Sequence, residues 1–265
     1  MKRLMVFNST LIAGAALSAS SFAFAVPISD NYVGGKDWGY GDRIGSSTFE
    51  VSGAEVNRNG TVVSVDIMTN FAGRADEKLF SGYTNRPASR LNGVNMGIGY
   101  GDLFLNTSWD PFGSAPYLQD DNVTGTLWGF AFSIDADRWT DAGGTGTLYA
   151  LNGPSNNSNA LLSDDFMSGA RYRNGQEIAV DRSANVTAIG SGTWTVTPGD
   201  RLSFQFDVAG TALANSSELA IHWAMGCGND TIEGIASLPT DVPMPEPGTA
   251  LLMLASLAGV RRFKS

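Results

Sequence analysis

The sequence predicts an all-β protein, with a single antiparallel β-sandwich of the lectin-like jelly-roll type over residues 26–240. Three observations predict this fold. Apolar and polar residues alternate at a period of two in several runs, which is typical of half-buried strands. Clusters of Gly, Asn, Asp and Ser separate these runs, and the chain contains 32 glycines, which suit tight turns. No part of the body shows a long helical stripe of apolar residues.

Individual strands follow from these runs. In the first one, Val63, Val65 and Ile67 share one face, as expected of a strand with one buried side. Later in the chain, a Pro-Gly-Asp sequence directly after residue 197 predicts a turn between two runs. The five clearest predicted strands cover 61–68, 127–134, 193–197, 201–208 and 218–225.

The N-terminus has the pattern of an export signal over residues 1–25. A basic Met-Lys-Arg opening precedes a mostly apolar stretch over 4–17. Ala23 and Ala25 then supply the small residues that signal peptidase requires ahead of its cut. The apolar stretch is too short and too interrupted to span a membrane well. We therefore expect a cleaved signal peptide and a mature chain that begins at Val26.

The C-terminal segment, residues 241–265, has three parts. A proline-rich stretch prevents helix and favours an extended, accessible conformation. An apolar run over 250–260 follows, which is shorter than a usual spanning helix and suits a transient anchor. Basic residues at the end would hold this anchor at the cytoplasmic face. The basic end consists of Arg261, Arg262 and Lys264.

This three-part tail resembles the PEP-CTERM sorting signal of exosortase substrates. The matching motif is Pro245, Glu246 and Pro247. The body is also similar to other PEP-CTERM ectodomains through 101–105 and 222–230. The resemblance implies a bacterial protein that is exported to the cell envelope or beyond, held transiently in the membrane by its tail, and processed by an exosortase. It also implies exopolysaccharide as a possible partner.

Charge argues against nucleic acid as a partner. The chain has 17 Lys and Arg against 26 Asp and Glu, a net charge of −9. Without the five basic and two acidic residues of the end segments, the body keeps twelve basic and 24 acidic residues, a net charge near −12. Such a surface repels phosphate backbones and attracts cations, including calcium.

Calcium is the one cofactor that the sequence suggests. Asp residues in loop-like settings supply the oxygen ligands that this ion prefers, although none of them forms an EF-hand loop. The alternative is that these carboxylates cap turns by binding their own backbone. The candidate ligands are Asp37, Asp42, Asp135 and Asp137.

The sequence does not predict an enzyme. His222 is the only histidine and Cys227 the only cysteine, so the sequence lacks the Cys and His spacing of a zinc site, and any Ser-His-Asp triad would need His222. The alternation of 218–225 places His222 on the face opposite Ile221 and Trp223, toward solvent or a concave surface. Cys227 is expected to be a buried, small apolar residue.

Two functions therefore remain for the body, and a third is remote. The first is a non-catalytic structural or adhesive role at the cell surface or in the exopolysaccharide matrix. The second is a calcium-dependent, lectin-like carbohydrate-binding module, since aromatic residues near polar loops could stack on sugars. The third, a glycoside hydrolase, lacks the paired carboxyl spacing on any strand. The aromatic residues are Trp38, Tyr40, Trp109, Tyr117 and Trp139.

Overall fold

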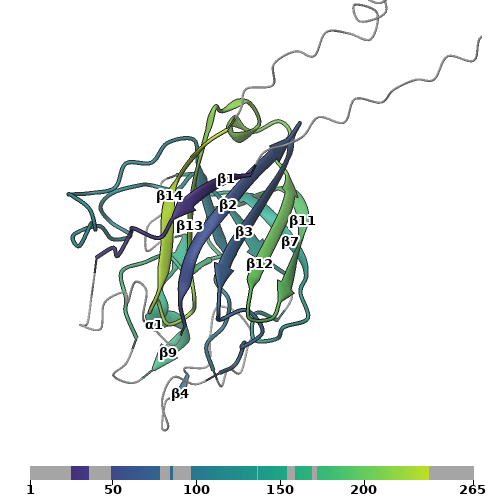
Figure 1. The fold of residues 1–265 in the computed structure, drawn as a ribbon. Helices are drawn as coiled ribbons and strands as arrows, with labels where there is room; N and C mark the ends of the chain where they lie inside the picture. Colours follow the sequence, from purple (N-terminus) through teal and green to yellow (C-terminus); the bar gives the residue numbers. More distant parts are fainter. Residues whose placement is uncertain are drawn as a thin grey trace, which may run out of the picture.

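A computed structural model describes residues 25–35, 49–77, 84–85, 97–135, 137–153, 159–168 and 172–238. Ten of its strands form one antiparallel sheet that curls almost into a barrel (Figure 1). In spatial order the strands are β1 (Val26–Ser29), β2 (Val51–Asn59), β3 (Val62–Thr69), β12 (Arg201–Asp207), β11 (Thr187–Thr197), β7 (Gly144–Ala150), β6 (Phe130–Ile134), β5 (Leu103–Asn106), β13 (Glu218–Ala224) and β14 (Thr231–Ser237). The prediction of a nearly all-β body is confirmed.

The remaining elements are short. β8 (Ala160–Leu161) pairs with β10 (Ala179–Val180), and β4 (Thr84–Asn85) pairs with β9 (Met167–Ser168). One turn of helix, α1 (Ser163–Phe166), and one 3₁₀ turn, η1 (Ala212–Asn215), complete the described structure. No helix among the described residues is long and apolar enough to cross a membrane.

The curl of the sheet brings its first and last strands together. A Cβ atom added to Gly234 of β14 would lie 2.6 Å from Cγ2 of Ile28 on β1, so only a glycine allows this approach. The pairing joins all ten strands into one sheet and does not by itself divide them into the two sheets of a jelly roll. The concave side of this sheet encloses the main core.

The main core follows the predicted alternation. On β3 the predicted inward residues Val63, Val65 and Ile67 are fully buried. On β12, Phe206 stacks on Phe132 of β6 with ring centroids 5.0 Å apart. The β11–β12 turn also occurs where it was predicted, and the Asp200 amide donates to the Thr197 carbonyl oxygen over 3.1 Å. These runs therefore form strands because one side of each is apolar and meets the same core.

A second, smaller hydrophobic cluster lies on the opposite face of β5, β6 and β13. The β5–β6 loop (residues 107–129) and the described residues between β7 and β11 contribute to it and cover this face. As a result, every residue of β13 after Glu218 is buried, whichever face of the sheet its side chain points to. The cluster consists of Phe104, Trp128, Ala131, Leu151, Ala160, Val180 and Ala220.

This covering corrects one expectation about His222. Its side chain does point away from Ile221 and Trp223, as the alternation predicts. It does not reach solvent, because the second layer encloses it, and its exposed fraction is 0%. Burial on both faces is common where loops pack over a sheet, and a period-two pattern does not report it.

Candidate functional site

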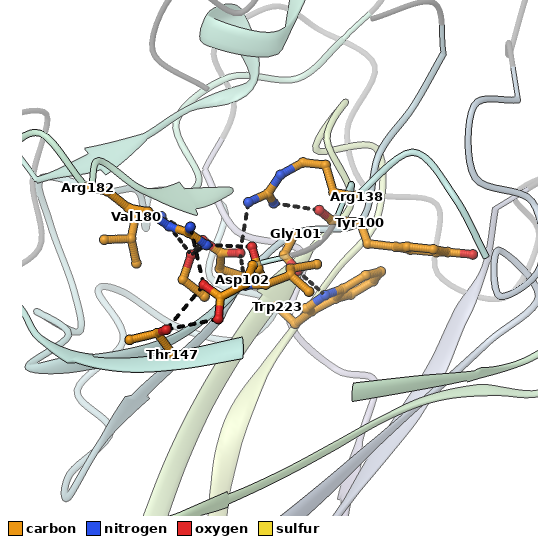
Figure 2. Close-up of polar contacts among 11 residues, drawn as sticks. Tyr100, Gly101, Asp102, Arg138, Thr147, Val180, Arg182 and Trp223 are labelled. Carbon is orange, nitrogen blue, oxygen red and sulfur yellow. Dashed lines mark hydrogen bonds and ion pairs between the residues drawn. The ribbon is translucent and has the colours of Figure 1, made fainter. Parts of the chain in front are cut away.

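The first polar centre surrounds Asp102, which directly precedes β5 and is fully buried (Figure 2). Its Oδ1 atom accepts hydrogen bonds from the Ile134 amide and from Nη2 of Arg138, both over 3.0 Å. Its Oδ2 atom accepts from the Ser133 hydroxyl over 2.8 Å and from the Val180 amide over 2.9 Å. This one carboxylate therefore joins β5, β6, β10 and the loop that follows β6.

Two arginines complete this centre (Figure 2). Nη1 of Arg138 also donates to the Tyr100 carbonyl oxygen over 2.7 Å. Arg182 donates to the Ser133 hydroxyl through Nη2 over 2.9 Å, and its Nη1 lies 3.3 Å from Asp135 Oδ1. Since donors already occupy both oxygens of the Asp102 carboxylate, the group is suited to holding segments together rather than to accepting a substrate proton.

The second polar centre is the His222–Glu233 pair, which spans β13 and β14 directly across the register. Nδ1 of His222 lies 3.0 Å from Oε2 of Glu233, and Nε2 lies 2.9 Å from the Glu177 carbonyl oxygen. A carbonyl oxygen only accepts, so Nε2 carries a proton. A second proton lies between Nδ1 and the Glu233 carboxyl, because two acceptors cannot face each other.

The charge state of His222 follows from these contacts. Burial by itself would lower the pKa of His222, but the hydrogen bond and the charge of Glu233, with a smaller contribution from Glu177, raise it above its ordinary value. The contacts of His222 with Glu233 and Glu177 therefore favour its protonated form. The Trp128 ring, 5.6 Å away between centroids, and the Phe104 ring, 5.9 Å away, enclose it.

Aromatic side chains lead from this pair to the surface. Nε1 of Trp109 donates to Oε1 of Glu233 over 2.8 Å. The Trp109 ring meets the edge of Tyr117, with centroids 5.4 Å apart, and Tyr117 stacks on the buried Tyr32 at 5.9 Å. Trp109 and Tyr117 are half-buried members of the β5–β6 loop. The loop is thus attached to the interior through aromatic contacts and one indole hydrogen bond.

Asp120 belongs to the same loop and has an exposed fraction of 2%. Its Oδ2 atom is buried without a hydrogen-bond partner among the described residues. Burial and then the charge of Glu233 raise the pKa of Asp120 to about 7. The loop closes tightly here, since a Cβ atom at Gly125, whose φ is +79°, would lie 1.8 Å from Oδ1.

The chain's only cysteine offers no reactive site. Cys227 is fully buried, as expected, and burial raises the pKa of its thiol to about 12. A thiol that stays protonated at neutral pH is a poor nucleophile. With His222 also enclosed and hydrogen-bonded at both ring nitrogens, neither residue has the exposure that nucleophilic catalysis requires.

The predicted calcium ligands divide into two groups. Asp37 and Asp42 lie outside the described residues. Asp135 is exposed, accepts from the Thr147 hydroxyl and pairs with Arg182, while Asp137 caps its own turn by accepting from the Trp139 amide over 3.0 Å. Within the described ranges, no group of three or more His, Cys, Asp or Glu side chains is placed to hold a metal.

The predicted processing residues lie mostly beyond the described ranges. Ala23 and the whole tail, including its sorting motif and its basic end, belong to the part that the structure does not describe. Ala25 is described and exposed, and β1 begins at the next residue, Val26. The tail residues are Pro245, Glu246, Pro247, Arg261, Arg262 and Lys264.

The predicted sugar-stacking aromatics also divide. Trp38 and Tyr40 lie outside the described residues. Trp139 is half-buried and packs against the main core, as most tryptophans do. Its ring centroid lies 6.4 Å from that of Phe166. Only Trp109 and Tyr117 combine partial exposure with a position on the β5–β6 loop.

Sequence reasoning missed the acidic residues of both polar centres. Asp102, Glu177 and Glu233 are each buried, yet nothing in the local pattern distinguishes them from solvated carboxylates. Glu233 lies opposite His222 in the β-ladder, so pairing of the last two strands would have been a usable signal. The backbone carbonyl oxygen of Glu177 contacts His222, which lies 45 residues away in the sequence, and no local pattern predicts such a contact.

Comparisons with known proteins add no relative. The chain matches no protein-family model, no curated protein and no solved structure.

Proposed function

We propose that this chain is an exported bacterial surface protein that an exosortase sorts to the cell envelope or the exopolysaccharide matrix, where its body has a non-catalytic structural or adhesive role. One observation carries the non-catalytic part. The only histidine and the only cysteine are fully buried, and the two polar centres use their groups to join strands and loops. A body of this kind offers a rigid support rather than a reaction site.

Two further observations support the export and adhesion parts. The first strand begins at Val26, the residue that follows the expected signal-peptide cut. The β5–β6 loop also exposes several large apolar side chains, and such exposure on one segment favours contact with another surface. These side chains are Phe112, Leu118, Val123 and Leu127.

Deletion of 241–265 tests the sorting role. The deleted chain is expected to leave the membrane fraction with a folded body, because the tail carries the only apolar run after residue 25 that could anchor it. The measurement is membrane fractionation of the producing cells, with far-UV circular dichroism of the released protein. Release of an unfolded body would contradict the separation of tail and body.

A second variant distinguishes a processing signal from a plain anchor. Alanines in place of Pro245, Glu246 and Pro247 keep the apolar run and the basic end, so this chain is expected to remain membrane-bound and unprocessed. If it matures and leaves the membrane like the unchanged protein, the exosortase role is wrong.

Carbohydrate binding by a lectin-like body is the second candidate, and the half-exposed pair Trp109 and Tyr117 favours it. The lectin-like jelly-roll arrangement belongs to this proposal. A glycan array with the purified chain, with and without a calcium chelator, is the test. Binding is expected to fall in Tyr117→Ala and to persist in Tyr149→Ala, which changes a half-buried tyrosine of β7. Equal loss in both variants would mean that Tyr117 does not contact the sugar.

A further inference from the structure

The residues that follow β1 form a strap, defined here as residues 30–35, that is held from two sides. On one side, the amides of Val33 and Gly34 donate to the Pro116 carbonyl oxygen over 3.0 and 3.3 Å, and the Gly35 amide donates to the Asp120 carbonyl oxygen. These bonds attach the strap to the β5–β6 loop.

On the other side, the buried Arg173 holds the strap to the body. Its Nη1 atom donates to the Val33 carbonyl oxygen, its Nε to the Gly228 carbonyl oxygen over 2.6 Å, and its Nη2 to the Thr231 hydroxyl over 2.5 Å. The strap thus lies between the loop and the start of β14. Movement of the loop would release the strap's outer hydrogen bonds.

One carboxyl oxygen that is buried without a hydrogen-bond partner lies at each end of this assembly. At one end is Oδ1 of Asp30, the first residue of the strap, and at the other is Oδ2 of Asp120 in the loop. An ionised carboxylate that keeps one buried oxygen without a donor costs more free energy than the protonated acid. Both positions therefore favour the neutral form for geometric reasons.

The charged groups that face these two carboxyls increase the preference. Asp230, which precedes β14, and Glu50, which precedes β2, face Asp30, and both are acidic. The charge of Glu233 on β14 raises the pKa of Asp120, while hydrogen bonds with the Phe112 backbone and the Tyr32 side chain of the strap lower it. The positive charge of His222 on β13 lowers the pKa of Asp120.

Arg173 and Glu177 complete this environment. Both residues come from the segment before β10. The charge of Arg173 lowers the pKa of Tyr32, whereas the charges of Glu177, Asp120 and Glu233 raise it. The guanidinium of Arg173 is directed to the strap carbonyls and to Thr231 by the bonds described above. Two acidic groups at one end and Glu233 at the other therefore oppose ionisation of the two carboxyls.

We propose that ionisation of Asp30 and Asp120 loosens the strap and the β5–β6 loop together, so that both are closed in acid and open as the solution becomes alkaline. The closed state would keep the His222–Glu233 pair covered and Trp109 and Tyr117 half-buried. The open state would expose them. This is a pH-dependent change in the surface that the loop presents.

The direction follows from the pKa values. Burial and neighbouring acids raise the pKa of both Asp30 and Asp120 from 3.8 to about 7. The stability that protonation gives the closed state is thus complete below 3.8 and is lost as pH rises toward about 7. The pKa of His222 is also raised, so loss of its positive charge on further alkalinisation removes the cation that acts on Asp120.

Hydrogen exchange followed by mass spectrometry tests the proposal on the purified full-length chain between pH 5 and 9. After correction for the intrinsic exchange rate, protection of peptides covering 26–35 and 107–129 is expected to fall by up to about tenfold per pH unit for each carboxyl until pH reaches about 7, and then to level off. Peptides from β3 and β12 in the same samples serve as the reference, because both strands lie in the main core. Constant protection of the strap and the loop across this range would overturn the proposal.

Variants identify the groups that titrate. In the double variant Asp30→Asn and Asp120→Asn, the amides imitate the protonated acids, so protection is expected to stay high and independent of pH. Each single variant is expected to remove part of the dependence. Asp110→Asn changes an exposed aspartate of the same loop and is expected to behave like the unchanged protein. A double variant that keeps the full pH dependence would overturn the proposal.

A calcium arm distinguishes protons from a metal ion. The same exchange experiment at pH 8 is run with calcium chloride and with a chelator. We expect no difference, because protons alone close the assembly. If calcium restores protection at pH 8 and the double variant loses this effect, the two carboxyls hold a cation and the proton-based proposal is wrong.

Discussion

At the scale of single residues, the protein buries an unusual set of charges and gives most of them partners. Asp102 receives four hydrogen bonds, and His222 is held between Glu233 and the Glu177 carbonyl. A satisfied buried network fixes the relative positions of the segments it joins, but the loss of one partner leaves a costly charge behind. The two centres are therefore the positions most sensitive to substitution.

Asp102→Asn tests the first centre. The variant leaves the buried Arg138 guanidinium without its anion, and its free energy of unfolding is expected to fall by about 3 kcal/mol. Asp66→Asn is the matched control, because its partner Arg201 lies 3.3 Å away on the exposed face of the sheet. The control should lose less than about 1 kcal/mol in urea denaturation. Similar losses in both variants would mean that burial does not strengthen the Asp102 pair.

Glu233→Gln tests the second centre through its pH dependence. The raised pKa of His222 gives stability that is fully present below its ordinary value of 6.5 and is lost as pH rises through the folded value. The variant is expected to lose about 3 kcal/mol near pH 5 and much less near pH 9, where its amide can donate to a neutral His222.

Urea denaturation of this variant and the unchanged protein at each pH gives the difference. Glu55→Gln, on the outer face of β2, is the control and should show a small loss at every pH. A loss in Glu233→Gln that is constant with pH, or that grows in alkali, would show that His222 is not held as a cation.

At the scale of elements, strands with one exposed face behave as their pattern predicts, and turns follow their residue types. The β11–β12 hairpin is the clearest case, because its Pro-Gly-Asp turn lies where the sequence places it. The β5–β6 loop has no such local signal. It owes its position to Trp109, Asp120 and the strap, all of which make contacts far away in sequence.

Gly199→Ala tests the hairpin. Gly199 has a φ of +70° and open space around its Cα, so a Cβ atom meets no neighbour and only backbone strain is added. The expected cost is about 1 kcal/mol of unfolding free energy, measured by thermal or urea denaturation. Gly129→Ala also meets no close neighbour, its nearest contact being 3.7 Å away, and should cost less. A larger loss at Gly129 would show that strain is not the cause.

At the scale of the whole molecule, one ten-stranded sheet curls until β1 reaches β14, and the β5–β6 loop covers part of its outer face. The N-terminal strand is therefore part of the closed body. The expected signal-peptide cut would leave this strand whole, because the residue after the cut is the first residue of β1.

The mature chain is expected to begin at Val26, which intact-mass analysis or N-terminal sequencing of the exported protein would show. Ala25→Leu places a large residue where signal peptidase requires a small one and should block the cut. Phe24→Leu changes the neighbouring position, where size is not restricted, and should mature normally. Retention of residues 1–25 in the exported protein would contradict the signal-peptide assignment.

The sequence by itself determined the β class, most of the clear strands, the turn at Gly199 and the face on which His222 lies. It did so because these features depend on local periodicity and on the conformational limits of single residues. The tail and the signal segment were also identified from sequence alone and stay predictions.

Only the tertiary structure decided that the outer face of β13 is covered, that His222 pairs with Glu233 beneath the β5–β6 loop, and that Asp120 is enclosed. The covering residues come from 107–129 and from the described residues between β7 and β11, and their contacts with β13 cross dozens of residues. A local pattern distinguishes the two faces of a strand, but it does not say what packs on the second face, because that depends on contacts between distant segments of the chain.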